Sequence, residues 1–261
     1  MVTPSIPSLT MPLHTTEALI LRTYKLNDAD RIVVFLTRDR GKKRGVAKGA
    51  RRLRSRFRGA LEPLTRASVV YFEKESRELV SLNDADTERS PLSAFHPEAL
   101  GYVGYLAELI DEWAPENDPN EKLFRLGAAV VEALAADIPV DALVRYFEFW
   151  LLRLQGVYPS VTTCQRCNGS LADGARLSPA ARTLVCRHCA PPAGASPLSP
   201  GALGFLRAAA TLGPLQLREA PLSAVAEREL AVVHRALITW HLEKDLRSAR
   251  VLREMRHAER H

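Results

Sequence analysis

Four cysteines constrain the fold of this chain more than any other feature of its sequence. They fall into two C-x-x-C pairs with 18 residues between the pairs. This is the spacing of a zinc ribbon, in which two short knuckles place four thiolates tetrahedrally around one Zn²⁺ ion. Turn-forming residues at 168–169 and 173–174 predict a small hairpin between the knuckles. We expect one zinc ion per chain, and its predicted ligands are Cys164, Cys167, Cys186 and Cys189.

This zinc ion is expected to be structural, because four thiolates complete its coordination shell and leave no position for water or substrate. Disulfides are the alternative, but the N-terminus lacks the basic segment and apolar core of a secretory signal. A thioredoxin-type redox pair would open a helix in an α/β context, and neither pair does so. We interpret His188, which lies between two better ligands, as a bystander.

A run of ten cationic side chains between Arg40 and Arg58 contains no carboxylate. Three glycines interrupt the run, which indicates strand and loop rather than a disordered tail. Residues 1–80 hold 17 Lys and Arg against 8 Asp and Glu, whereas residues 81–261 hold 19 against 22. The positive surplus therefore belongs to one module, and a polyanion is its expected partner. The alternative is a solvated face, although mixed signs would serve solubility better.

Aromatic side chains near these cations are candidates for base stacking. For Tyr24, Phe35, Tyr71 and Phe72 a place in the barrel core is the favoured interpretation. Phe57 is the exception, because it lies among arginines in a segment without an obvious core pattern, so we predict that it stacks on a base. The predicted nucleic-acid-binding residues are Arg40, Lys42, Lys43, Arg44, Lys48, Arg51, Arg52, Arg54, Arg56, Phe57 and Arg58.

The first third of the chain has the pattern of a small barrel. Short segments rich in β-branched and aromatic residues alternate with turn signals, at residues 18–24, 31–37, 43–48, 67–74 and 79–87. Five strands of this length are typical of the OB-fold, whose basic groove suits single-stranded nucleic acid.

After residue 90 the apolar period changes from that of strands to that of helices. Helices are expected over residues 100–113, 118–136, 140–156 and 199–212, and after residue 223. The three predicted N-caps are Asp118, Ser199 and Ser223. The predicted fold is α+β, an OB-fold barrel followed by an all-helical domain with an inserted zinc ribbon. Its expected parts are a loose extension (1–14), the OB-fold (15–88), the helical domain (89–159 and 197–261) and the ribbon (160–196).

Signatures of an enzyme or a membrane protein are missing from the sequence. It contains no phosphate-binding glycine loop, no dinucleotide-binding or zinc-protease motif and no nucleophile elbow. Asp84, Asp86 and Glu88 share one strand face and would suit a metal-dependent nuclease, but a solvated edge is favoured. No apolar window approaches the roughly 18 residues of a membrane-spanning helix. We expect a non-enzymatic, cytoplasmic protein.

Several segments together resemble the RecO family of bacterial recombination mediators and DNA repair proteins. The resembling segments are residues 18–22 (ALILR), 30–33 (DRIV), 35–37 (FLT), 41–42 (GK), 47–52 (AKGARR), Ser55, 61–64 (LEPL), 147–152 (FEFWLL) and 156–159 (GVYP), the last of which leads into Cys164. The resemblance spans about residues 15–245, so the N-terminal extension lies outside it. Some members of the family lack the ribbon cysteines, whereas this sequence keeps all four.

The resemblance implies a nucleoid-associated, ATP-independent protein that binds single- and double-stranded DNA and anneals complementary strands. It further implies binding to the C-terminal tail of the single-stranded DNA-binding protein SSB, and cooperation with RecR, in many organisms also RecF, in loading RecA. The residues of the SSB-tail pocket carry no motif and stay unassigned. An RNA-binding or ribosome-associated factor is the alternative, since barrels and zinc ribbons also occur there. A purely structural hub would bind proteins and no nucleic acid.

Overall fold

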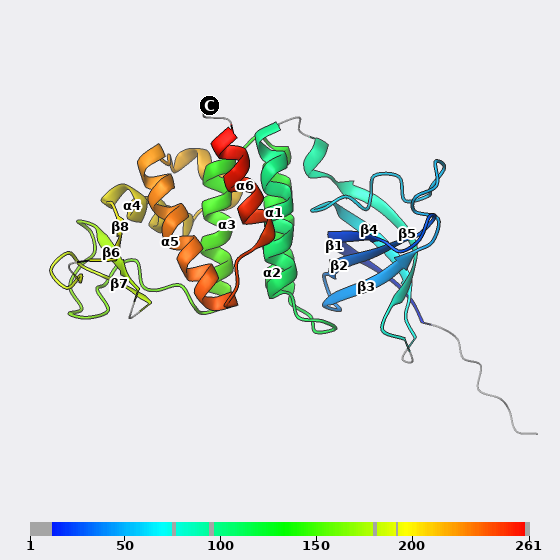
Figure 1. The fold of residues 1–261 in the computed structure, drawn as a ribbon, viewed down its shortest axis with the longest axis horizontal. Helices are drawn as coiled ribbons and strands as arrows, with labels where there is room; N and C mark the ends of the chain where they lie inside the picture. The colour runs from blue at the N-terminus through cyan, green and yellow to red at the C-terminus, as the bar shows by residue number, and fades with distance from the viewer. Residues whose placement is uncertain (1–11, 75–76, 94–96, 180–181, 192, 259–261) are drawn as a thin grey trace, which may run out of the picture.

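Strands come first along the chain and helices follow, as Figure 1 shows. The computed structural model describes residues 12–258, with gaps at 75–76, 94–96, 180–181 and 192. A barrel lies at one end of an elongated molecule, helices form its middle and a small sheet lies at the other end. The mixed α+β class is thereby confirmed. Most of the predicted N-terminal extension lies outside the described residues, and the first strand begins at Leu13.

Five strands close the barrel in the order β1-β2-β3-β5-β4. Neighbouring strands are antiparallel except for β3 and β5, which are parallel. The strand number and the closure agree with the OB-type barrel expected from the sequence. The strands are β1 (Leu13–Lys25), β2 (Arg31–Thr37), β3 (Lys42–Ala47), β4 (Arg66–Phe72) and β5 (Val80–Arg89).

Both faces of β1 and β2 are buried where they meet the helices, which explains their unbroken apolar runs. Ile20 and Phe35 point into the barrel core, whereas Leu19 and Leu36 belong to the core of the helical part. Gly127 makes the contact with β1 possible, because a Cβ atom there would lie 2.6 Å from Leu19 Cδ1. The barrel and the helices therefore share one apolar interface.

Six α-helices and two short 3-10 helices follow within the described residues. None of the described helices combines the length and apolarity needed to cross a bilayer. Their bounds are η1 (Pro91–Ser93), α1 (Pro97–Trp113), α2 (Glu121–Ala135), α3 (Val140–Leu154), α4 (Pro200–Ala209), η2 (Pro214–Glu219), α5 (Ala224–Leu242) and α6 (Arg247–Ala258).

Two of the three predicted helix caps are confirmed. The hydroxyl groups of Ser199 and Ser223 accept hydrogen bonds from backbone amides in the first turns of α4 and α5. The third prediction is wrong, because Asn120 caps α2 by accepting a hydrogen bond from the Leu123 amide at 3.1 Å. The backbone of Asp118 instead packs against Gly41 of the barrel, so the chain turns into the helix two residues later.

A three-stranded sheet lies at the end of the molecule opposite the barrel (Figure 1). Its strands are β6 (Ala175–Ser178), β7 (Thr183–Val185) and β8 (Ser196–Leu198), in the order β7-β6-β8. Buried Leu177, Leu184 and Leu198 join the core of the helices. The predicted hairpin between the two cysteine pairs is therefore present, and it is attached to the helices rather than isolated.

A buried polar network joins α1, α3 and α5. The Glu148 carboxylate accepts hydrogen bonds from Tyr105 Oη at 2.6 Å and lies 2.9 Å from both Arg145 Nη1 and His234 Nδ1. Tyr158 Oη lies 2.8 Å from the other ring nitrogen of His234. A buried charge of each sign thus has its partner at hydrogen-bond distance, as a low-dielectric interior requires.

Candidate nucleic-acid interface and four-cysteine centre

The chain between β3 and β4 forms a long irregular loop, and its first part carries most of the predicted cations. We call residues 48–58 the arginine loop. The Asp30 carboxylate accepts a hydrogen bond from the Gly49 amide at 2.8 Å, which fixes the start of the loop. The pKa of Asp30 is lowered mainly by this backbone hydrogen bond and by a hydrogen bond from the side-chain amide of Asn27 at 2.9 Å. The anchor therefore stays ionised at neutral pH.

Arg51 attaches the loop to the turn between β1 and β2. Its Nη1 donates to the carbonyl oxygens of Asn27 and Asp28 at 2.9 and 3.3 Å. Its backbone amide donates to the Ala29 carbonyl at 2.9 Å. The loop thus lacks helix or strand and is still held in place by hydrogen bonds to the barrel.

All six cations of the arginine loop are exposed, including Arg51. Across the described parts of the chain, none of the loop's cations lies within 4.0 Å of a carboxylate. Six exposed positive charges against the nearby carboxylates of Asp30 and Glu62 leave the loop with a net positive charge that attracts anions. The exposed cations are Lys48, Arg51, Arg52, Arg54, Arg56 and Arg58.

A hollow of about 170 Å³ lies beside the loop, with Arg31, Arg52 and Arg58 around it. Arg31 stands at the start of β2, outside the run of cations, and the sequence interpretation missed it. Arg31 directly follows the β1–β2 turn, and Arg51 attaches the arginine loop to the same turn. The position of Arg31 next to the predicted turn was therefore the one sequence signal for its place beside the loop. Glu62 also lines this hollow, so its positive charge is partly offset.

The structure corrects the prediction for Lys42 and Lys43. Both side chains are buried in ion pairs, Lys42 with Asp111 at 3.2 Å and Lys43 with Glu73 at 2.6 Å. Lys42 also donates to the Asp111 carbonyl at 2.7 Å. These partners lie 69 and 30 residues away in the sequence, so the run of cations gave no sign of them. Neither ammonium group is available to a phosphate.

Arg40 and Arg44 are exposed but have carboxylate neighbours. Arg40 Nε lies 3.7 Å from Asp39, and Arg44 Nη2 lies 2.9 Å from Glu116. Exposed pairs of this kind are weak and exchange readily for other anions. For these two residues, and for the six cations of the arginine loop, contact with nucleic acid stays a prediction.

Phe57 is buried, and its prediction as a stacking residue is wrong. Only 2% of the residue is exposed, and it packs in the barrel core with Ala60 and Leu61. The guanidinium of Arg56 lies 5.2 Å from the ring centroid and covers its outer side. The apolar spacing of residues 57, 60, 61 and 64 is the signal that identifies this segment as core.

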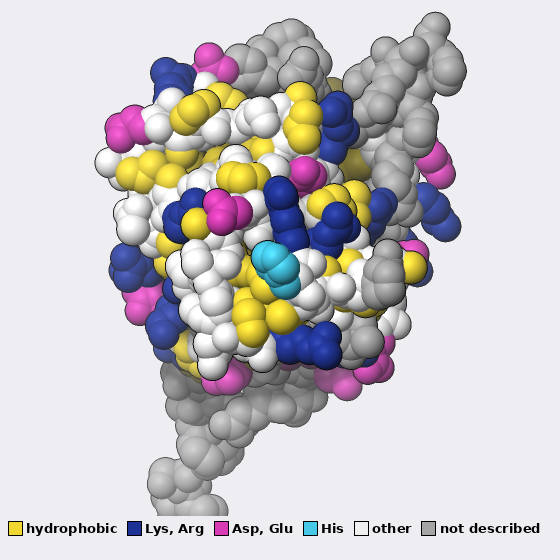
Figure 2. Space-filling model, turned by 90° about the vertical axis from the view of Figure 1, so that its left-hand side faces the viewer, with side chains coloured by type: hydrophobic (Ala, Val, Ile, Leu, Met, Phe, Trp, Pro, Cys, Tyr) yellow, Lys and Arg dark blue, Asp and Glu magenta, His cyan; other side chains and the backbone are white. Residues whose placement is uncertain are grey.

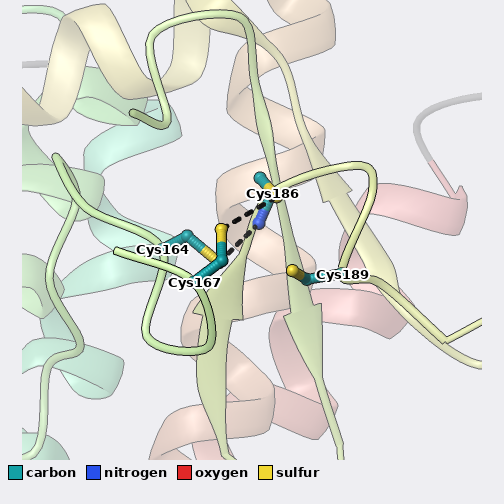
Figure 3. A group of neighbouring side chains, drawn as sticks. All are labelled: Cys164, Cys167, Cys186 and Cys189. Carbon is teal, nitrogen blue, oxygen red and sulfur yellow. Dashed lines mark hydrogen bonds between the residues drawn. The ribbon is translucent and has the colours of Figure 1, made fainter. Parts of the chain in front are cut away.

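The four cysteines converge from two knuckles, as Figure 3 shows. Their sulfur atoms all lie within 4.8 Å of one another, and Cys167 Sγ lies 3.8 Å from Cys186 Sγ. Two ligands of a tetrahedral zinc ion with bonds of about 2.3 Å lie about 3.8 Å apart, so the donor set fits this metal. The Cys186 amide donates to Cys164 Sγ at 3.3 Å, which stabilises a thiolate there.

The pKa values of two of these thiols diverge strongly. Burial opposes ionisation of Cys164, but amide hydrogen bonds from Cys186, Arg166 and Cys167 outweigh it and lower its pKa to about 6. Hydrogen bonds to the Cys167 and Cys186 sulfur atoms raise the pKa of Cys189 to about 12. Four thiolates this close repel one another, and a bound cation is what would let all four ionise together.

The acidic residues considered for a nuclease do not form a comparable centre. Within the described residues, the four cysteines are the one group of three or more potential metal ligands. Glu88 pairs with Arg66 at 2.9 Å, and the Asp84 carboxylate caps its neighbour's amide. His188 is exposed and lies outside the cysteine cluster, as expected of a bystander.

The charge on the ribbon end of the molecule is mixed. Figure 2 shows that face, where cationic, acidic and hydrophobic side chains alternate without a field of one sign. The arginine loop belongs to the opposite end (Figure 1). The positive surplus in the first third of the sequence therefore lies at the barrel end of the fold, and the ribbon end carries charges of both signs.

Two family models match the chain and together cover nearly all of the described structure. One, described as "Recombination protein O N terminal", matches residues 11–91, and the other, "Recombination protein O C terminal", matches residues 95–250. The chain belongs to the RecO family. The N-terminal RecO model contains the barrel with its arginine loop, and the C-terminal RecO model contains α1 to α5, the start of α6 and both cysteine pairs.

Curated RecO proteins from several bacteria are similar to the chain along most of its length. "DNA repair protein RecO" of Desulforudis audaxviator is 34% identical over 252 residues, which cover 94% of this chain and 98% of that protein. The protein of the same name from Anaeromyxobacter sp. (strain K) is 33% identical over 241 residues, 91% of this chain and 94% of that protein. That of Koribacter versatilis is 42% identical over 178 residues, 67% and 72% respectively. The chain is thus a member of a family of DNA repair proteins.

Proposed function

We propose that this chain binds single- and double-stranded DNA through the arginine loop and anneals complementary strands during repair and recombination. The observation that carries the proposal is the set of six exposed loop cations for which the described residues supply no carboxylate within 4.0 Å. The family adds DNA as the polyanion, because its members are named DNA repair proteins.

Attraction to phosphates accounts for the proposed binding. Each cation that contacts a phosphate releases condensed counterions, so affinity falls with the logarithm of salt concentration and depends little on sequence. Two complementary strands held on one cationic surface repel each other less and meet at a higher local concentration. Annealing then requires no covalent step and no bound nucleotide, and the proposed activity is not enzymatic.

The partners of the proposed activity follow from the family rather than from a contact in this chain. We propose that the protein works with RecR, and in organisms that have it with RecF, to load RecA onto SSB-coated DNA. The C-terminal tail of SSB is the further proposed partner. In this scheme the barrel holds DNA, and the helical part is the side available to proteins.

We also propose that the four cysteines bind one structural Zn²⁺ ion. The mutual distances of the sulfur atoms support this assignment, as does the amide that donates to Cys164 Sγ. The ion would neutralise the thiolates and hold the two knuckles together. Leu177 and Leu184 would then keep the ribbon sheet against the helices.

Removal of three loop charges tests the DNA proposal. We expect the variant Lys48→Ala, Arg52→Ala, Arg54→Ala to bind DNA more weakly and to show a salt slope smaller by roughly 2 to 3, at about 0.7–0.9 per lost phosphate contact. Arg51 is left unchanged because it holds the loop to the barrel. Fluorescence anisotropy with labelled single-stranded and duplex DNA at several salt concentrations measures both quantities.

A matched control removes three cations that already have partners, in the variant Arg38→Ala, Arg89→Ala, Lys244→Ala. It lowers the net charge equally and should change the salt slope much less. An equal effect of both variants would show that net charge, not the loop, attracts DNA. Tighter binding of RNA than of DNA, with no annealing of DNA strands, would favour the RNA-binding alternative.

A further inference from the structure

A row of apolar side chains crosses the outer face of the barrel. In the strand register Tyr24 lies opposite Ile32, and Ile32 lies opposite Val46. Val33 and Phe35 point into the barrel core, so the alternating residues of β2 point outward. Tyr24 is 45% exposed, which leaves a large part of the side chain uncovered at the edge of this row.

A parallel row carries two arginines. Val34 lies between Arg22 and Arg44 in the register, two residues along β2 from Ile32 and on the same face of the strand. The two rows enclose a hollow of about 210 Å³, which Leu79 and Asp111 complete. The guanidinium of Arg22 lies 5.6 Å from the centre of the Tyr24 ring. The lining of the hollow thus combines the apolar side chains of Ile32, Val34 and Leu79 with the Tyr24 ring and three charged residues.

The cations around this hollow have carboxylate neighbours. Asp111 pairs with both Arg22 and the buried Lys42, and Arg44 lies 2.9 Å from Glu116. A phosphate would compete with these carboxylates, whereas a neutral ring would not. In this the hollow differs from the arginine loop, for whose cations the described residues supply no carboxylate within 4.0 Å.

The hollow and the arginine loop are neighbours on the surface. Tyr24 precedes the β1–β2 turn, and the carbonyl oxygens of this turn accept hydrogen bonds from Arg51. Lys25 and Arg31 lie between the two features, opposite each other in the register. A strand whose phosphates follow the arginine loop thus has a path that brings a base to Tyr24.

From this geometry we propose that Tyr24 is the stacking platform for one unpaired nucleobase, which enters the hollow formed by Arg22, Ile32, Val34 and Arg44. The inference rests on the proposed DNA binding and assigns different roles to the two features. The arginine loop attracts the phosphates of single- and double-stranded DNA, whereas Tyr24 contacts a base that is not stacked within a duplex. The site therefore favours single strands.

The test compares oligothymidylate with an abasic sugar-phosphate strand of the same length. The wild-type protein should bind oligothymidylate more tightly, and Tyr24→Ala should lose on the order of tenfold of that preference, the usual weight of one base stacked on an aromatic ring. Tyr24→Phe should keep it. The salt slope should stay unchanged in both variants, because no phosphate contact is removed.

Leu13→Ala is the matched control, since Leu13 is 55% exposed on the same strand but lies at its other end, away from the hollow. It should leave the ratio between the two strands as in the wild type. An unchanged ratio in Tyr24→Ala would overturn the stacking inference while leaving the proposed DNA binding intact. Failure of the wild type to bind either strand would instead overturn the proposed function.

Discussion

Burial of Phe57 links the folding of the barrel to the position of the arginine loop. The ring lies in the barrel core, while Arg56 and Arg58 on either side of it are exposed. A buried ring between exposed cations acts as an anchor, because its removal from the core would also release the neighbouring arginines. Phe57 therefore supports the proposed nucleic-acid surface without being exposed on it.

Phe57→Ala should lower the free energy of unfolding by about 3–5 kcal/mol, the usual cost of emptying a buried aromatic site. Urea denaturation followed by circular dichroism measures this loss. Phe57→Leu keeps part of the apolar volume and should cost less, with DNA affinity retained in the folded protein. Full stability of Phe57→Ala together with loss of DNA binding would instead indicate a stacking residue.

At the scale of elements, the proposed zinc ion would stabilise the ribbon and not the barrel. The ribbon's three strands are short, and besides the cysteines its two knuckles are joined by a hydrogen bond from Arg166 Nη1 to the Cys189 carbonyl at 3.3 Å. The barrel, by contrast, closes on its own core of buried side chains. Loss of the metal should therefore affect the two ends of the molecule differently.

We expect one zinc ion per chain in metal analysis of the purified protein, and loss of that ion in Cys164→Ser. Ribbon amides should then exchange with solvent faster, while barrel amides and DNA affinity stay close to wild type. Hydrogen exchange measures the first effect. His188→Asn is the control and should keep its zinc. Purified wild-type protein without zinc would contradict the assignment.

The sequence predicted the structural features that depend on local patterns, but it did not predict contacts between residues that are far apart in the chain. The five strands, the cysteine spacing and the caps Ser199 and Ser223 depend on neighbours in sequence, and these were predictable. The buried pairs of Lys42 and Lys43 depend on carboxylates that only the closed fold brings near. The position of Tyr24 beside the hollow was likewise not predictable, because it depends on cross-strand partners such as Ile32.

At the scale of the whole molecule, the buried network makes stability depend on pH. Burial lowers the pKa of His234 more than the Glu148 carboxylate raises it. Burial raises the pKa of Glu148, but Arg145 and His234 outweigh this and lower it. In acid, the unfolded chain therefore binds protons at both residues before the folded chain does. Stability present at neutral pH is lost as the pH falls.

The free energy of unfolding should decline below about pH 6.5, where an unfolded histidine takes up its proton, and more steeply below about pH 4.5. Each proton contributes at most about 1.4 kcal/mol per pH unit. His234→Asn should flatten the first decline, with the exposed His241→Asn as control for the loss of a histidine. Urea titrations from pH 4 to 8 measure the slopes. An unchanged slope in His234→Asn would refute the assignment.

The hydrogen bonds that Arg51 and Gly49 make to the barrel have a thermodynamic consequence for any anion that binds there. A loop already fixed in its bound shape loses little conformational freedom on association, so most of the electrostatic attraction is retained as affinity. A disordered basic tail with the same charges would have to be ordered first. For the proposed DNA binding, the arginine loop would in this sense be preorganised, although its backbone is irregular.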